Sequence, residues 1–447
     1  MKINSSIKHI LICATSVIAL ASCGGGNDVA SGGAVTGVTS ASAVSAGGPN
    51  GATANSATSN SAVSTSVTST KAAMDRIGQN SQKSSIYFDM TAVGDMSNLP
   101  NAIGSSGMKN YNMVMFGAMS ATDVNSNGAI NPTYLGYMKS IISLESPGTL
   151  NFYTVGGGTT CSYGDPRGAP CNGTLFTGNG TIFANAAIKQ VQAYNTALNA
   201  AGLPQLVGID LELENGHCSA FILDAATAIK SANLKVSIAP QIVSSQSNLV
   251  STSPQNNVWY SSGGGTGTNY NPPFVGGCQD PSMSVYWGKG GSPANNEYYP
   301  AIAAGKVDYI QTQLYNQYGY TIDGTNPMAL GSLAKFAQIF SILSSSSCSN
   351  GSFPNSSCVP DSVSGVLLGE AVNNQAGAGS EFTVSVPAVP YLTVLNSLTS
   401  DIANSLPIMN GMMMWQASAD WLYFNNAGAT SPGQTSKAFA KSLGIAN

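Results

Sequence analysis

Three acidic residues alternate with apolar residues in the segment LVGIDLELENG, residues 206–216. In an extended strand, alternate side chains point to opposite faces, so Asp210, Glu212 and Glu214 share one face. Like charges about 7 Å apart repel one another and raise at least one pKa. A protonated carboxyl group beside an ionised one is typical of general acid catalysis on a glycosidic bond. An edge strand with an acidic solvent face is the alternative, but Asp and Glu are poor strand formers. The cluster is therefore a catalytic candidate.

The first 22 residues have the organisation of an export signal. Lys2 and Lys8 precede the apolar run ILICATSVIALA, residues 10–21, which is too short to span a membrane. The run ends in LASC, residues 20–23, which resembles a bacterial lipobox, in which the cysteine is lipidated. The resemblance implies that Cys23 is the lipidation site. Because no aspartate follows Cys23, it further implies an outer-membrane or cell-surface lipoprotein. An ordinary signal peptide and a secreted protein are the alternative.

The rest of the chain divides into a tether and one domain. Residues 23–75 consist almost wholly of Gly, Ser, Ala, Thr, Val and Asn, which cannot bury enough apolar surface to fold. Residues 80–447 are long enough for a single barrel with insertions. The net charge of −4 and the lack of a basic cluster argue against nucleic acid as a partner. We expect a monomer that meets the membrane through its lipid anchor only.

Six cysteines remain when Cys13 in the signal and Cys23 are set aside, and an even number fits disulfides in an exported protein. Two pairs each flank a short loop, and a third pair follows by elimination. The predicted disulfides are Cys161–Cys171, Cys348–Cys358 and Cys218–Cys278. The chain has no C-x-x-C spacing, and His217 is its one histidine outside the signal, so we expect neither a metal nor a cofactor.

Short apolar runs alternate with helical stretches such as residues 181–202 and 220–233, which indicates parallel βα units. The candidate strands are residues 85–90, 111–119, 149–157, 206–214, 234–242, 307–316, 365–372 and 409–418. Eight strands predict an α/β fold, a (β/α)8 TIM barrel, with long loop insertions after the third and fifth strands. Functional residues are expected at the carboxyl ends of the strands. The insertion after the fifth strand carries Trp259, Tyr260 and Trp287, which either form an aromatic wall for sugar rings or anchor a long loop.

The segment VGIDLELE resembles the D-G-x-D-x-D-x-E signature of glycoside hydrolase family 18, the chitinases and related endo-N-acetylglucosaminidases. In that family the signature ends the fourth barrel strand. Other segments resemble further motifs of the family in the same order along the chain. They are TVGGG on the third strand, SIAPQ on the fifth, DYIQTQLYN on the sixth and GMMMWQASAD on the eighth. The resemblance spans about residues 85–425.

The resemblance implies a role for each matching residue. Glu214 matches the general acid that protonates the leaving oxygen, Glu212 the carboxylate that orients the acetamido group of the sugar, and Asp210 its charge-balancing neighbour. Tyr315 matches the tyrosine that hydrogen-bonds the acetamido carbonyl, and Trp415 matches the aromatic floor under the distorted sugar. Further substrate contacts are implied at Gln241, Gln313 and Asn316.

The implied reaction is retaining hydrolysis of β-1,4-linked N-acetylglucosamine polymers, in which the acetamide of the substrate attacks the anomeric carbon. Two residues depart from the signature. Val207 replaces its first aspartate, and Glu212, longer by about 1.5 Å, replaces its middle aspartate. A catalytically weak or inactive carbohydrate-binding protein is therefore one alternative, and an endo-β-N-acetylglucosaminidase acting on glycans is another.

Overall fold

A computed structural model of the chain describes residues 82–124, 127–156, 180–213, 219–240, 298–315, 330–344, 358–373, 376, 381–383, 389–405 and 409–445. The expected signal peptide and tether lie outside these residues. Within them, no helix is both long enough and apolar enough to cross a lipid bilayer.

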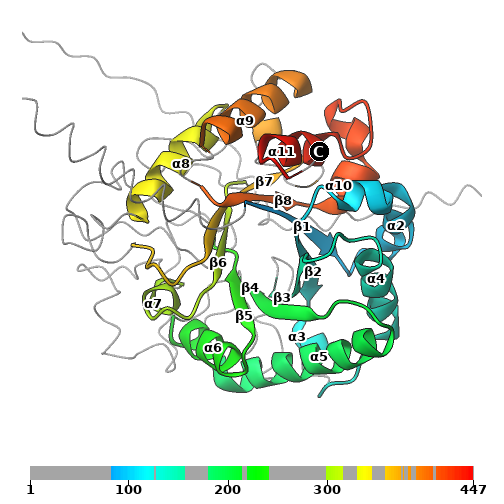
Figure 1. The fold of residues 1–447 in the computed structure, drawn as a ribbon, viewed down its shortest axis with the longest axis vertical. Helices are drawn as coiled ribbons and strands as arrows, with labels where there is room; N and C mark the ends of the chain where they lie inside the picture. Colours follow the sequence, from blue (N-terminus) through cyan, green and yellow to red (C-terminus); the bar gives the residue numbers. More distant parts are fainter. Residues whose placement is uncertain are drawn as a thin grey trace, which may run out of the picture.

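The centre of the molecule is a closed barrel of parallel strands in the order β1-β2-β3-β4-β5-β6-β7-β8 (Figure 1). The strands are β1 (Lys83–Asp89), β2 (Met113–Met119), β3 (Leu150–Gly156), β4 (Leu206–Glu212), β5 (Lys235–Ile238), β6 (Tyr309–Gln313), β7 (Gly365–Ala371) and β8 (Gly411–Trp415). The pairing of β1 with β8 closes the barrel, beginning at Lys83 opposite Gly411.

Helices surround the barrel and connect successive strands (Figure 1). They are α2 (Val93–Met108), α3 (Ala121–Val124), α4 (Pro132–Ile142), α5 (Gly180–Ala200), α6 (Ser219–Ser231), α7 (Tyr299–Ala303), α8 (Ser332–Leu343), α9 (Tyr391–Ser405), α10 (Ala417–Trp421) and α11 (Gln434–Ser442). Two short 3-10 helices, η3 (Glu381–Thr383) and η4 (Phe424–Ala427), complete the described elements.

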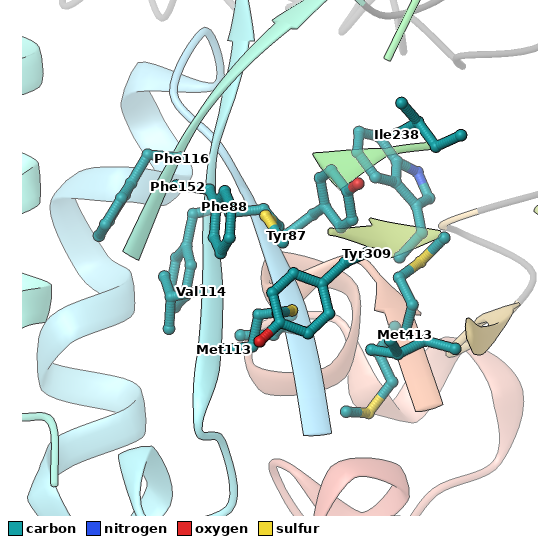
Figure 2. Close-up of a cluster of buried hydrophobic side chains, with 14 of the residues drawn as sticks. Tyr87, Phe88, Met113, Val114, Phe116, Phe152, Ile238, Tyr309 and Met413 are labelled. Atoms are coloured by element: carbon teal, nitrogen blue, oxygen red, sulfur yellow. The ribbon is translucent and has the colours of Figure 1, made fainter. Parts of the chain in front are cut away.

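The strands are apolar because both of their faces are buried, which is the usual pattern of a parallel sheet covered by helices. Side chains that point into the barrel pack across it. The rings of Phe152 and Tyr309, for example, meet edge to face with their centroids 6.0 Å apart. Side chains that point outwards meet the helices or their strand neighbours, as in the stacked pair Phe88 and Phe116. Figure 2 shows part of this core, with Tyr309 near Met113 and Met413.

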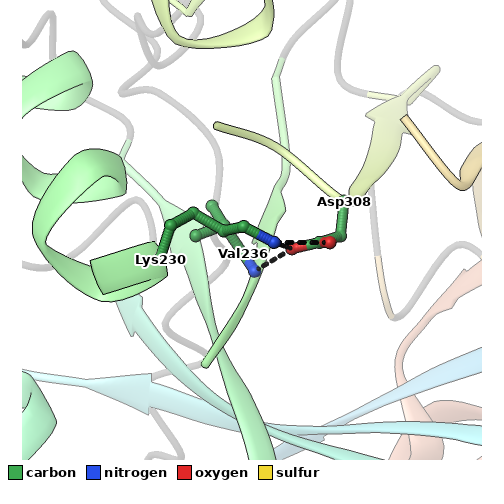
Figure 3. Close-up of polar contacts among 3 residues, drawn as sticks. All are labelled: Lys230, Val236 and Asp308. Carbon is green, nitrogen blue, oxygen red and sulfur yellow. Dashed lines mark hydrogen bonds and ion pairs between the residues drawn. The ribbon is translucent and has the colours of Figure 1, made fainter. Parts of the chain in front are cut away.

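A partly buried ion pair joins three elements at the amino end of β6. Lys230 Nζ at the end of α6 lies 2.8 Å and 2.9 Å from the two carboxylate oxygens of Asp308 (Figure 3). Asp308 Oδ2 also accepts a hydrogen bond of 2.7 Å from the backbone N–H of Val236 in β5. Asp308 opens the DYIQTQLYN segment, so this motif residue connects α6, β5 and β6 and lies at the opposite end of β6 from the expected site.

The structure confirms the predicted fold class and all eight predicted strands. Every strand after β1 is shorter than predicted, and β5, β6 and β8 are shortened most, to Lys235–Ile238, Tyr309–Gln313 and Gly411–Trp415. Strand β4 ends at Glu212, and β8 ends at Trp415 because α10 begins at Ala417. Most of the long insertions, with Trp259, Tyr260 and Trp287, lie outside the described residues.

One of the six cysteines expected to form disulfides is described. Cys358 is disulfide-bonded, and its partner lies outside the described residues. The pairing of Cys358 with Cys348 therefore stays a prediction. The other two pairs also stay predictions, because Cys161, Cys171, Cys218 and Cys278 lie outside the described residues.

Candidate active site

The acidic face of β4 points into the barrel at the carboxyl end of the strand. Asp210 has no exposed surface, and Glu212 is 2% exposed. Asp210 Oδ2 accepts hydrogen bonds from the hydroxyl of Tyr87 at 2.8 Å and from Thr154 Oγ1 at 3.1 Å. These partners come from β1 and β3, so three strands converge on one carboxyl group. The site is an enclosed acidic centre and not a solvent-exposed strand face.

A chain of neutral polar groups runs beside Asp210. Ser85 Oγ donates to Gln311 Oε1 at 2.6 Å, and Gln311 Nε2 donates to Ser237 Oγ at 2.9 Å. Because Ser237 Oγ accepts from the amide, its own hydrogen is available to a carboxylate. Burial raises the pKa of Asp210, while hydrogen-bonding groups around it, led by Ser237, act in the opposite direction. The surroundings of Asp210 thus supply donors that offset part of the cost of burying its charge.

Tyr87 lies at the centre of the site. Its ring centroid is 5.5 Å from that of Trp415, and its hydroxyl donates to Asp210. Burial raises the pKa of Tyr87 well above its usual value, and the charges of Asp210 and Glu212 and the nearby Tyr315 raise it further. Tyr87 is therefore a neutral hydrogen-bond donor, and the residues that perturb it share one region of the barrel.

The family-like motifs include Thr154, the first residue of TVGGG, but not Tyr87. Both are on the inward face of their strands, as alternation within residues 85–90 and 149–157 indicates. Alternation identifies several inward residues on each strand and does not show which of them reaches Asp210. That selection depends on the stagger of the strands around the barrel.

A glycine lets β3 lie close against the end of β4. Gly156 pairs with Glu212 in the strand register and has a φ of +120°, a conformation that side chains rarely adopt. A Cβ atom at this position would overlap the carbonyl oxygen of Glu212. Gly156, the first glycine of the TVGGG segment, therefore allows the backbone of Glu212 to lie directly against β3.

The ends of β6 and β8 contribute the remaining described site residues. Gln313 is buried, and its Nε2 donates to the carbonyl oxygen of Ala239 at 3.1 Å, while its backbone N–H donates to Pro240 at 2.9 Å. Tyr315 lies two residues beyond the end of β6, Trp415 ends β8, and both are at most 3% exposed. In the described structure, Gln313 connects the ends of β5 and β6.

Four of the residues singled out from sequence, Asp210, Glu212, Tyr315 and Trp415, lie around Tyr87, and a fifth, Gln313, lies at the carboxyl end of β6. The other expected site residues lie outside the described residues. These are Glu214, Gln241 and Asn316, together with Cys23 at the expected lipid anchor.

No protein-family model and no curated protein matches the sequence. The chain is similar to the solved GH18 chitinase ChiB of Flavobacterium johnsoniae, with 8% identity, a TM-score of 0.40 and coverage of 81% of this chain and 94% of that one. It is also similar to the Group IV chitinase of Ostrinia furnacalis, with 11% identity, a TM-score of 0.45 and coverage of 81% and 100%.

A family GH18 chitinase from Cycas revoluta, solved in complex with allosamidin, has 12% identity, a TM-score of 0.39 and coverage of 80% and 99%. The solved structures to which the chain is similar thus include chitinases of glycoside hydrolase family 18, the family that its strand-end motifs resemble.

Proposed function

We propose that the chain is a glycoside hydrolase that cleaves β-1,4-linked N-acetylglucosamine polymers, such as chitin or its oligosaccharides. The observation that carries the proposal is the enclosed pair Asp210 and Glu212 at the carboxyl end of β4, with Tyr87 and Trp415 beside it. Paired acids beside an aromatic ring, at the end of a barrel where active sites lie, suit a sugar substrate.

In the proposed reaction, Glu214 protonates the oxygen of the leaving sugar. The acetamido oxygen of the substrate attacks the anomeric carbon, the glycosidic bond breaks, and a positively charged oxazolinium forms. The Glu212 carboxylate orients the acetamido group and stabilises that charge. Water then attacks the anomeric carbon and opens the oxazolinium ring, and Glu214, now ionised, accepts a proton from this water. No metal or cofactor takes part in these steps.

The remaining residues support the carboxylates. Tyr87 and Thr154 donate to Asp210, which lets Asp210 remain charged or share a proton with its neighbour on the same strand face. Tyr315 is proposed to hydrogen-bond the acetamido carbonyl, with Gln241, Gln313 and Asn316 as further substrate contacts. The ring of Trp415 forms the floor of the proposed sugar site.

A carbohydrate-binding protein without hydrolase activity is the second candidate. The observation that favours it is Glu212, which has one more carbon–carbon bond than the aspartate of the signature. Misplacing a reacting group by about 1 Å can reduce the rate about 100-fold. Such a protein would bind N-acetylglucosamine oligomers without cutting them.

The decisive experiment uses the variant Glu214→Gln with a chitotriose substrate. A general acid contributes about 10²- to 10⁴-fold, so the variant should lose nearly all hydrolysis while keeping most of its affinity, because the amide has the same shape. Glu145→Gln is a matched control. Glu145 accepts a hydrogen bond from Asn151 near the amino end of β3, away from the site, and its variant should hydrolyse at the wild-type rate.

The stereochemistry of the first product tests the mechanism separately. Proton NMR of the early product should show the β-anomer, and cello-oligosaccharides should remain intact because they have no acetamido group. Wild-type hydrolysis by Glu214→Gln, or an α-anomeric product, contradicts the proposed reaction. Binding without cleavage by the wild-type protein would favour the second candidate.

We further propose that the enzyme is attached to the outer membrane through a lipid on Cys23, with residues 24–75 as a tether. The LASC segment and the composition of the following residues support this proposal. Cells that express the protein should incorporate a labelled fatty acid into it, and Cys23→Ser should abolish the label. A labelled Cys23→Ser protein would contradict the assignment of the anchor.

A further inference from the structure

The end of β4 is held by a side chain from the start of a helix. Tyr298 directly precedes α7, and its side chain is completely buried. Its hydroxyl accepts a hydrogen bond of 2.8 Å from the backbone N–H of Leu213. The same hydroxyl donates to the carbonyl oxygen of Leu211 at 2.9 Å, with that of Leu213 as a second acceptor at 3.2 Å. Tyr298 therefore contacts the backbone on both sides of Glu212.

The backbone of Leu213 needs a hydrogen-bond partner from outside the sheet because β4 extends further than its neighbour β5. Strand β5 ends at Ile238, and the N–H of Ala239 donates to Leu211 at 3.3 Å. Leu213 lies one residue beyond β4 and is fully buried. A buried backbone group left without a partner costs about 1–3 kcal/mol. A phenol hydroxyl both donates and accepts, so it can replace the next residue of a neighbouring strand.

The position of Tyr298 is itself determined by α7. The carbonyl oxygen of Tyr298 accepts the N–H of Ile302 at 3.2 Å, which makes Tyr298 the first residue of the helical turn. Pro300 stands at the second helical position, where its fixed φ suits the helix and no N–H is needed. Pro300 and Ile302 are buried, so the turn that carries Tyr298 is packed into the protein.

We propose that Tyr298 is a positioning residue for the reaction at the end of β4. By holding Leu211 and Leu213, it sets the direction of Glu212, which shares the inward face of β4 with Asp210. Tyr298 acts through the strand and not on the substrate. The inference rests on the proposed function, because rate depends on placing these carboxylates to within about 1 Å.

The experiment compares Tyr298→Phe with Tyr194→Phe. Tyr194 is a buried tyrosine on α5 whose hydroxyl accepts a hydrogen bond of 3.3 Å from the backbone of Asn131, outside the barrel. Each variant removes one buried hydroxyl. In Tyr298→Phe, hydrogen exchange at the Leu213 amide should accelerate about 10- to 100-fold. With chitotriose, kcat should fall about 10- to 100-fold while KM changes less than about two-fold. Tyr194→Phe should change neither quantity.

The two readouts separate the two proposals. Unchanged exchange at Leu213 in Tyr298→Phe overturns the holding role, whatever the activity. Faster exchange with wild-type kcat overturns the role in the reaction. A wild-type protein that cuts no oligomer refutes the proposed function, whereas the exchange result still decides whether Tyr298 holds the strand. If Tyr298→Phe does not fold, the wild-type protein provides the test: the Leu213 amide should exchange as slowly as that of Ile209 inside β4, and fast exchange overturns the proposal.

Discussion

At the scale of single residues, the site depends on neutral donors around buried acids. Asp210 has no exposed surface, yet Tyr87 and Thr154 donate to one of its oxygens. A buried carboxylate without such donors would take up a proton. Burial raises the pKa of Asp210, and the hydrogen bonds from its donors oppose that rise, so these donors favour the charged form of the carboxyl group.

The length of the Glu212 side chain gives a prediction at this scale. Shortening it in Glu212→Asp withdraws the carboxylate by about 1.5 Å, and we expect kcat on chitotriose to fall by about 10- to 100-fold. The reason is that the backbone of Glu212 pairs closely with Gly156, so it cannot move forward to return a shorter side chain to the same position. Steady-state hydrolysis measures the effect, with Glu145→Asp as a control for the same shortening outside the site. A rise in kcat would instead indicate that Glu212 is a defect in a binding protein.

At the scale of elements, the first turns of two helices are bound by carboxyl groups from other elements. Glu381 in η3 accepts hydrogen bonds from Ser332 Oγ at 2.9 Å and from the N–H groups of Gly331 and Leu333 at the start of α8. Asp420 in α10 does the same for the first turn of α11. The N–H groups of a first helical turn have no partner within the helix. These tertiary contacts satisfy them and fix where each helix docks on the barrel.

The Glu381 contact predicts how stability depends on pH. Burial raises the pKa of Glu381 to about 7. Its hydrogen bonds oppose only part of this rise, and the charge of Asp401 adds to it. Burial and the charge of Glu381 also raise the pKa of Glu370 on β7. A carboxyl group with a raised pKa in the folded state stabilises the fold fully below its unfolded pKa, and this stability is lost as pH rises through the folded pKa.

We therefore expect the free energy of unfolding to fall between about pH 5 and pH 8, with Glu381 contributing roughly 3 kcal/mol of the change. Glu381→Gln keeps an acceptor for the α8 N-terminus and removes the charge, so it should flatten this decline. Urea denaturation at a series of pH values measures it. Asp361→Asn, at an exposed position after Cys358, is the control and should follow the wild-type curve. An equally steep decline in Glu381→Gln would assign the pH dependence to other groups.

At the scale of the whole molecule, the fold depends on closing the barrel between its first and last strands. Lys83 and Gly411 are opposite one another at the start of this seam. Gly411 has a φ of +148°, and a Cβ atom there would overlap the carbonyl oxygen of Lys83. The absence of a side chain lets the two backbones approach closely enough for the barrel to close.

Gly411→Ala should reduce the free energy of unfolding by about 2 to 4 kcal/mol, because it combines backbone strain with overpacking at the seam. Gly136→Ala is the matched control. A Cβ at Gly136, inside α4, meets no atom within 4 Å, so this variant should stabilise the protein by about 0.5 to 1 kcal/mol. Chemical denaturation of both variants distinguishes a specific effect at the seam from a general effect of adding a methyl group to a glycine. Wild-type stability of Gly411→Ala would show that the seam can accommodate a side chain.

Much of this architecture follows from sequence alone. Runs of apolar residues between helical stretches identify the eight strands, and alternation places Asp210 and Glu212 on one face of the fourth. These features are local, because the two-residue period of a strand is set by the backbone itself. The order of the motifs along the chain likewise suffices to place the candidate site at the carboxyl ends of the strands.

The partners of the site residues could be seen only in the tertiary structure. Tyr87 and Asp210 are 123 residues apart, Ser85 and Gln311 are 226 apart, and Tyr298 reaches Leu213 across 85 residues. Alternation determines which face a side chain occupies, but the stagger of neighbouring strands determines which side chain lies opposite. Sequence thus determined the barrel and the strand that carries the acids. Only the closing of that barrel, through contacts between distant residues, decided which hydroxyl groups hold Asp210 and which tyrosine holds the end of its strand.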